Sequence, residues 1–237
     1  MAAINCVRVS AAGAASNTDA TTYAGGAATP VANATYFVVS AARVTAGQTQ
    51  TPTLSGTNEW NVTWTDRSAG GVLVNSLLRL TVFSGVIGGS PTSGVLTADY
   101  TGQTQEAHVL GVFRVLNAGQ VPVQTKTGTT VGGTSISVTL DNAFGDVWNG
   151  VLFIAASTGT GAGVLDDVTY HVIGNVQSAT DGVRVIARYA PDNTATVAPT
   201  GFGSGDIAAL LIELDHDGSD VGGGVGPGRS IPRGLAH

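Results

Sequence analysis

Residues 151–156 read Val-Leu-Phe-Ile-Ala-Ala, a run in which every side chain is apolar. A six-residue segment with no polar position fits a strand in the middle of a sheet that is covered on both faces. Other segments alternate large apolar and polar residues, among them Leu78–Phe83 and Ser135–Leu140. A period of two is typical of half-buried strands. Together these patterns predict a β protein.

The same two patterns predict about ten strands at short and fairly even spacing. The predicted strands are Tyr36–Val44, Trp60–Thr65, Leu78–Phe83, Gly94–Tyr100, His108–Leu116, Ser135–Leu140, Val151–Ala156, Val168–Ile173, Val183–Tyr189 and Asp206–Leu214. Glycine-rich segments at 88–94, 128–133 and 159–163 are expected to be loops, and we find no amphipathic helix. The sequence therefore predicts an all-β fold: an antiparallel β-sandwich, jelly-roll-like, with extended N- and C-terminal arms.

The chain has 237 residues, a length that one β-sandwich domain can occupy. We expect residues 1–19 to form an N-terminal arm or edge strand, residues 20–216 the sandwich, and residues 217–237 a Gly/Pro-rich C-terminal arm. From residue 221 onward this arm contains arginines and no acidic residue, whereas the whole chain has a net charge of −6. A cationic arm of this kind can dock on a neighbouring copy, and a merely disordered terminus is the alternative. The expected contacts are Arg229, Ile231, Arg233 and Leu235.

Charged residues make up only 11% of the chain, less than half of the roughly 25% found in an average soluble domain. Such a surface is either covered by neutral polar side chains or buried against partners. The negative net charge argues against nucleic-acid binding, which favours a basic surface. No apolar run approaches the roughly 18 residues needed to cross a bilayer. No signal peptide is visible at the N-terminus, so we expect synthesis in a cytoplasm and a soluble product.

The sequence offers no recognisable catalytic or cofactor motif. The four histidines form no metal-binding spacing, and the glycines lie outside the contexts that cradle phosphate. In the Gly-Phe-Gly-Ser-Gly segment at 201–205, the serine is one place too late for a nucleophile elbow. Cys6 is the only cysteine, which excludes an intrachain disulfide, and we expect it to be a small buried apolar residue. We therefore expect no enzyme activity and no cofactor.

One acidic cluster, Asp215, Asp217 and Asp220, is a weak candidate for a calcium site because alternate carboxylates surround a glycine. The cluster lacks the bidentate glutamate that closes such a loop, and a solvated acidic turn is the preferred interpretation.

Aromatic residues raise a second alternative, a platform on which sugars stack. Its candidate members are Trp60, Trp64, Trp148, Tyr23, Tyr100 and Tyr189. Trp60 and Trp64 are four residues apart in a predicted strand and would share one face. Two tryptophans on one face are more often anchors of a core than a ligand platform.

Several segments, read in order, resemble a loosely defined family of β-sandwich modules of tailed-phage virion proteins and some bacterial surface proteins. They are Thr29–Val39, Thr51–Gly56, Trp64-Thr65, Arg79–Phe83, Ser93–Thr97 and Ala209–Leu214. The similarity runs from about residue 20 to 215 and covers strand and turn positions. The resemblance implies a jelly-roll-like fold and a virion setting, and it transfers no catalytic residue.

On this basis we expect a phage virion structural protein, either a capsid decoration protein or a tail accessory protein. Its partners would be copies of itself, in a trimer or another ring, and the major capsid or tail proteins. It would lie on the virion surface after synthesis in the host cytoplasm. A carbohydrate-binding or host-adhesion module that binds a host glycan is the second hypothesis, and a hydrolase with an unrecognised site is the third.

Overall fold

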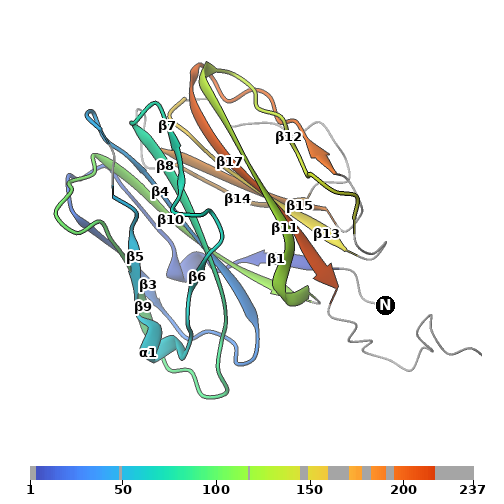
Figure 1. The fold of residues 1–237 in the computed structure, drawn as a ribbon. Coiled ribbons are helices and arrows are strands. Elements are labelled where there is room, and N and C mark those ends of the chain that lie inside the picture. The colour runs from blue at the N-terminus through green and yellow to red at the C-terminus, as the bar shows by residue number, and fades with distance from the viewer. Residues whose placement is uncertain are drawn as a thin grey trace, which may run out of the picture.

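The computed structural model describes residues 4–47, 50–116, 118–144, 149–159, 171–177, 183–190 and 195–216. Nearly all of the regular structure in these ranges is antiparallel β-sheet, as Figure 1 shows. The helical segments in the same ranges are one turn of 3-10 helix, Ser10–Ala12, and the four-residue helix α1, Thr57–Trp60. The prediction of an all-β, antiparallel sandwich is confirmed.

Two large sheets form the centre of the molecule. Sheet I has the order β1-β10-β4-β8-β6, with β2 also paired to β10 and β7 also paired to β8. Its strands are β1 Asn5–Arg8, β2 Ala14–Ser16, β4 Thr35–Arg43, β6 Thr65–Asp66, β7 Val72–Val74, β8 Leu78–Val86 and β10 Ala107–Leu116. Sheet II has the order β11-β17-β13-β15-β14. Its strands are β11 Ala118–Gly133, β13 Gly150–Ser157, β14 His171–Gln177, β15 Arg184–Ala190 and β17 Gly205–His216.

Two small sheets cover the outer faces of the large ones. Sheet III has the order β3-β9-β5, and sheet IV pairs β12 with β16. Their strands are β3 Thr22–Ala28, β5 Thr53–Ser55, β9 Gly94–Asp99, β12 Val138–Thr139 and β16 Thr196–Val197. In Figure 1, sheet III and α1 lie at one side of the molecule and β12 lies at the opposite side. The layers therefore follow the order III, I, II, IV.

Three hydrophobic clusters fill the spaces between these four layers. Along β13, Phe153 joins the cluster beneath sheet IV, while Leu152 and Ile154 join the cluster between sheets I and II. Along β4, Tyr36 faces sheet III and Phe37 faces sheet II. Both strands are therefore buried on both faces. This arrangement confirms the interpretation of residues 151–156 as a central strand covered on both sides.

The predicted strand Trp60–Thr65 is wrong over most of its length. Helix α1 ends at Trp60, and Asn61 then adopts a left-handed backbone conformation with φ of 49°. Only Thr65 belongs to a strand, β6. The alternation in the sequence is nevertheless meaningful, because Trp60, Val62 and Trp64 all pack in the cluster between sheets I and III. A turn can place alternate side chains inward as a strand does.

The loop predicted at residues 128–133 is also wrong, because these are the last six residues of β11. Gly128 is glycine for a packing reason. A Cβ atom at this position would lie 2.7 Å from Cγ2 of Val138, which packs over the strand. The regular pairing of β11 with β17 ends at Thr130, and Gly132 with φ of 61° belongs to the irregular end.

Other segments differ from the predictions at their boundaries. Within the predicted strand Ser135–Leu140, only Val138–Thr139 is a strand. The predicted strand Val168–Ile173 overlaps β14 from His171 onward, and residues 168–170 lie outside the described residues. The N-terminal segment supplies β1 at one edge of sheet I, and β2, which also pairs with β10. In the part of the chain that the structure describes, no helix has the length and apolar character needed to cross a bilayer.

Candidate functional site: an open sheet edge

A cluster of buried polar and aromatic side chains lies between sheets I and III. The Ser40 hydroxyl lies 2.9 Å from Nε2 of His108 and 2.8 Å from the hydroxyl of Tyr100. The Tyr23 ring stacks on the His108 imidazole, with ring centroids 4.4 Å apart. Ser40, Tyr100 and His108 are fully buried.

The Ser40–His108 pair resembles part of a nucleophilic dyad, but its environment does not suit catalysis. Burial lowers the pKa of His108 to about 3, so the imidazole stays neutral and is a poor base. Its Nδ1 atom has no hydrogen-bond partner among the described residues, so no carboxylate orients the ring there. A substrate cannot reach side chains that are entirely covered. The cluster is therefore part of the packed core between sheets I and III.

A buried carboxylate, Glu213, lies on β17 and holds two neighbouring segments in place. Nε2 of Gln124 donates to Oε2 of Glu213 at 2.6 Å, and Nδ2 of Asn149 donates to Oε1 at 2.6 Å. Asn149 in turn accepts a hydrogen bond from the backbone N–H of His216. Both oxygens of this buried carboxylate thus have hydrogen-bond donors, as buried polar atoms require. These contacts fix β11 and the segment before β13 against β17.

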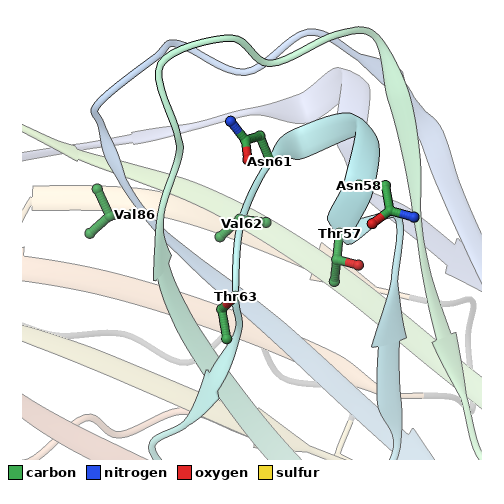
Figure 2. A pocket seen from close by; sticks show the side chains of 6 residues that line it. All are labelled: Thr57, Asn58, Asn61, Val62, Thr63 and Val86. Atoms are coloured by element: carbon green, nitrogen blue, oxygen red, sulfur yellow. The ribbon is translucent and has the colours of Figure 1, made fainter.

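Two adjacent surface hollows flank residues 62–63, near the edge of sheets I and III. One, of about 650 Å³, is lined by Thr57, Asn58, Asn61, Val62, Thr63 and Val86, and Figure 2 shows these side chains around the end of α1. The other, of about 530 Å³, is lined in part by Trp64, Asp66 and Phe83. Both oxygens of Asp66 already accept hydrogen bonds, from Ser68 and Gly70. Among the described residues that line the two hollows, there is no pair of free carboxylates that could act as acid and base.

Those aromatic residues considered for a sugar platform that the structure describes do not gather into one. Trp60, Tyr23 and Tyr100 are buried in the cluster between sheets I and III. Trp64 is half-buried, with its ring centroid 6.3 Å from that of Trp60, and it lines the smaller hollow. Tyr189 packs instead on the cluster between sheets I and II, and Trp148 lies outside the described residues.

The longest described strand is β11, which lies beside β17 in Figure 1. Among the described residues, β11 pairs with β17 alone, so its other edge is open. Its pairing is regular over residues 124–130, and irregular pairing flanks this stretch on both sides. We call this stretch, on the side facing away from β17, the open edge. A sheet edge of this kind presents backbone N–H and C=O groups that can pair with another strand.

One face of β11 carries an exposed, uncharged row of β-branched side chains. Its members in the regular stretch are Thr125, Thr127 and Thr129, and the exposed Val123 and Val131 continue the row at the irregular ends. The two valines are 47% and 65% exposed and are among the most exposed large apolar side chains of the described chain. Thr125 is opposite Ile212 and Thr127 is opposite Leu210, and both partners point toward sheet I. Because the threonines are nevertheless exposed, this face of β11 extends past the cover that sheet I provides.

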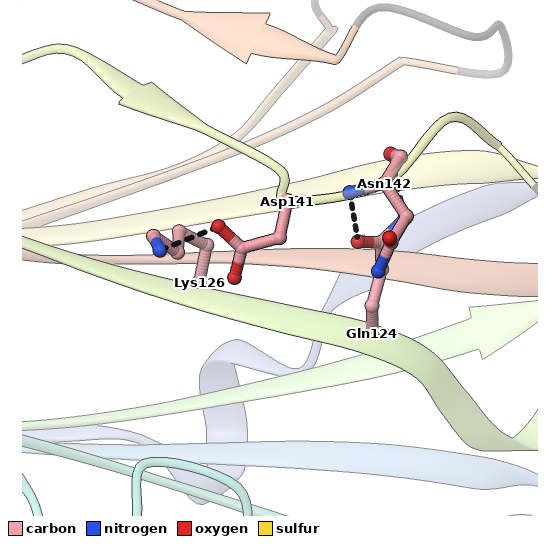
Figure 3. Close-up of polar contacts among 4 residues, drawn as sticks. All are labelled: Gln124, Lys126, Asp141 and Asn142. Carbon is pink, nitrogen blue, oxygen red and sulfur yellow. Dashed lines mark hydrogen bonds and ion pairs between the residues drawn. The ribbon is translucent and has the colours of Figure 1, made fainter.

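The opposite face of β11 is held by the segment that follows β12, as Figure 3 shows. The ammonium group of Lys126 lies 2.6 Å from Oδ1 of Asp141, and the Gln124 side chain exchanges two hydrogen bonds with the Asn142 backbone. Lys126 is the only lysine in the chain and the only charged residue of β11. Charged side chains, lysine especially, commonly protect an edge strand from pairing with other chains. In this protein Lys126 instead forms an ion pair with Asp141 of its own chain.

The residues predicted as sites are only partly placed by the structure. Asp215 is exposed near the end of β17, while Asp217 and Asp220 lie outside the described residues. Within the described ranges, no three His, Cys, Asp or Glu side chains gather in a way that could hold a metal ion. The expected tail contacts Arg229, Ile231, Arg233 and Leu235 also lie outside the described residues.

Sequence reasoning missed the open edge because the glycines at 128, 132 and 133 suggested a loop. A signal was present, since residues 123–131 carry valine or threonine at every second position. Comparison of the chain with models of protein families, with curated proteins and with solved structures finds no match.

Proposed function

We propose that this chain is a phage virion structural protein, a capsid decoration or tail accessory protein that acts through protein–protein contacts. The observation that carries the proposal is the open edge of β11. Within the part of the chain that the structure describes, it combines backbone groups that have no second strand partner with an exposed row of neutral β-branched side chains. Soluble proteins usually protect such an edge with charges, prolines or a covering segment. An edge left open along seven regular residues is therefore best explained by a protein partner.

The composition supports the same proposal. Interface cores are depleted in charged residues, and only 11% of this chain is charged. The chemically active side chains of the described core, such as His108 and Glu213, are enclosed and have structural contacts. The resemblance to tailed-phage β-sandwich modules supplies the virion setting. A four-layer body with neutral contact surfaces suits repeated attachment at symmetry-related positions.

The proposal is tested by adding the purified protein to particles produced by a phage mutant that lacks this gene. We expect saturable binding with a fixed number of copies per particle. The matched control is a variant with Thr125→Lys and Thr129→Lys, which charges the open edge and leaves the core unchanged. Absence of binding to particles by the unmodified protein would contradict the proposal.

A second candidate function is a carbohydrate-binding or host-adhesion module, and one observation favours it. The smaller hollow combines the half-buried ring of Trp64 with hydroxyl groups from Thr51, Thr53 and Thr63. An aromatic face beside hydrogen-bonding groups is a common way to bind sugars. A glycan array with the purified protein tests this function. Binding that Trp64→Ala abolishes would support it, and an array without binding would exclude the glycans presented.

A further inference from the structure

We infer that the open edge of β11 pairs with β11 of a second copy, antiparallel and centred on Thr127, to join two copies of sheet II into one continuous sheet. The inference names one partner for the proposed contact function and rests on that function.

The exposed row of β11 is symmetric about Thr127. Thr125 and Thr129 stand at equal distances on either side, and Val123 and Val131 follow at the next equal distance. In an antiparallel pair centred on Thr127, each of these residues is opposite its own kind. Threonine opposite threonine and valine opposite valine are favourable cross-strand pairs. The regular stretch, residues 124–130, is centred on the same residue.

The single charged side chain of β11, Lys126, is compatible with this pairing. Centring on Thr127 places Lys126 of each copy opposite Gly128 of the other, which carries no side chain. Lys126 is also paired with Asp141 of its own chain, on the face turned away from the threonines. Like charges placed directly opposite each other destabilise a strand pair, and this register contains none. A shift of the register by one residue would place the exposed side chains of one strand opposite the covered side chains of the other. Such a shift is therefore disfavoured.

Such a pair obeys the two-fold symmetry that most homodimers adopt, because the same surface serves both copies. The nine residues 123–131 alone form a small interface, below the roughly 1,600 Å² of a standard complex. Leu73 of β7 is 38% exposed, and β7 packs against β11, so an adjacent apolar side chain can add to the contact. We therefore expect a weak dimer in free solution.

Cysteine cross-linking tests the register. Opposite residues in an antiparallel pair have Cα atoms about 4.5–5.5 Å apart, a separation that a disulfide spans. Thr127→Cys should therefore give a covalent dimer on mild oxidation. Thr125→Cys should not, because the two copies of residue 125 would be about 14 Å apart along the strands. The double variant Thr125→Cys/Thr129→Cys should cross-link again. The native Cys6 is buried and does not compete.

A charge exchange gives an independent readout by analytical ultracentrifugation. Thr125→Lys/Thr129→Lys opposes like charges and should raise the dissociation constant of the dimer at least about tenfold. Thr125→Lys/Thr129→Glu opposes unlike charges and should restore pairing. All of these positions are exposed, so the fold is retained, which circular dichroism verifies. A monomer at concentrations up to about 100 µM, or equal cross-linking at residues 125 and 127, would overturn the inference. The experiment uses no particle, so a failure here leaves particle binding as a separate result.

Discussion

Nε2 of His108 lies 2.9 Å from the Ser40 hydroxyl, and neither side chain is exposed to solvent. The imidazole is also stacked on Tyr23 and faces Tyr100 edge-on, at centroid distances of 4.4 Å and 5.7 Å. A neutral histidine thus joins strands β4 and β10 of sheet I to the aromatic cluster beneath sheet III. Because charging this ring inside the core is unfavourable, the cluster makes the stability of the fold sensitive to acid.

We expect the protein to lose stability as the pH is lowered below 6.5. Burial lowers the pKa of His108 to about 3, while the unfolded chain has the ordinary value of about 6.5. Between these values the unfolded state binds a proton that the folded state does not, so the free energy of unfolding falls with the pH. This one group should lower it by about 2 kcal/mol between pH 7.5 and pH 5.

Urea denaturation at the two pH values measures this change. His108→Gln is the matched variant, because a glutamine does not titrate in this range. The part of the pH dependence due to His108 should disappear in that variant. An unchanged pH dependence would show that His108 does not stay neutral in the folded protein.

Cys6 should be unreactive in the folded protein. Burial raises the pKa of its thiol, and the side chain is only 6% exposed, so little thiolate is available. Ellman's reagent should therefore modify no thiol in the native chain and one thiol in urea. Ser90→Cys places a second thiol on an exposed loop and should react at once, as a positive control. Rapid modification of the native chain would mean that β1 opens readily from β10.

Gly25→Ala should destabilise the fold by about 1–3 kcal/mol. A Cβ atom at residue 25 of β3 would overlap the carbonyl oxygen of Ala12, which belongs to the 3-10 helix packed on that strand. Backbone atoms cannot yield as a flexible side chain can. Gly89→Ala is the control, because a Cβ there meets no atom within 4 Å. Equal melting temperatures for the two variants would contradict the close approach.

Asn149→Ala should cost about 1.5–3 kcal/mol of stability, because it removes a hydrogen bond to the buried carboxylate of Glu213. Asn142→Ala should change stability by less than about 0.5 kcal/mol, because Asn142 is exposed and contacts Gln124 through its backbone. Chemical denaturation of both variants measures the difference. A neutral effect of Asn149→Ala would indicate that water replaces the amide at Glu213.

The sequence patterns predict the central strands well and the periphery poorly. Continuous or alternating apolar residues occur in the central strands because other sheets cover them; these strands are β4, β8, β10, β13 and β17. Burial requires apolar residues, so the sequence indicates these strands directly. Helix α1 has only four residues, too few for a helical period, so its Trp60 suggested a strand. The sequence did not predict the candidate site on β11 for a related reason. Gly128 suggested a turn, but it is glycine because Val138 packs closely against it. The layering of four sheets depends on long-range contacts that no local pattern contains.

The proposed virion role is tested most directly by an electron cryo-microscopy map of the intact phage particle. We predict density for this four-layer β-sandwich on the outside of the head or tail, repeated at symmetry-related positions. Where two copies meet, we expect their β11 strands to lie side by side. A complete particle map in which no such sandwich is present would contradict the proposed virion role.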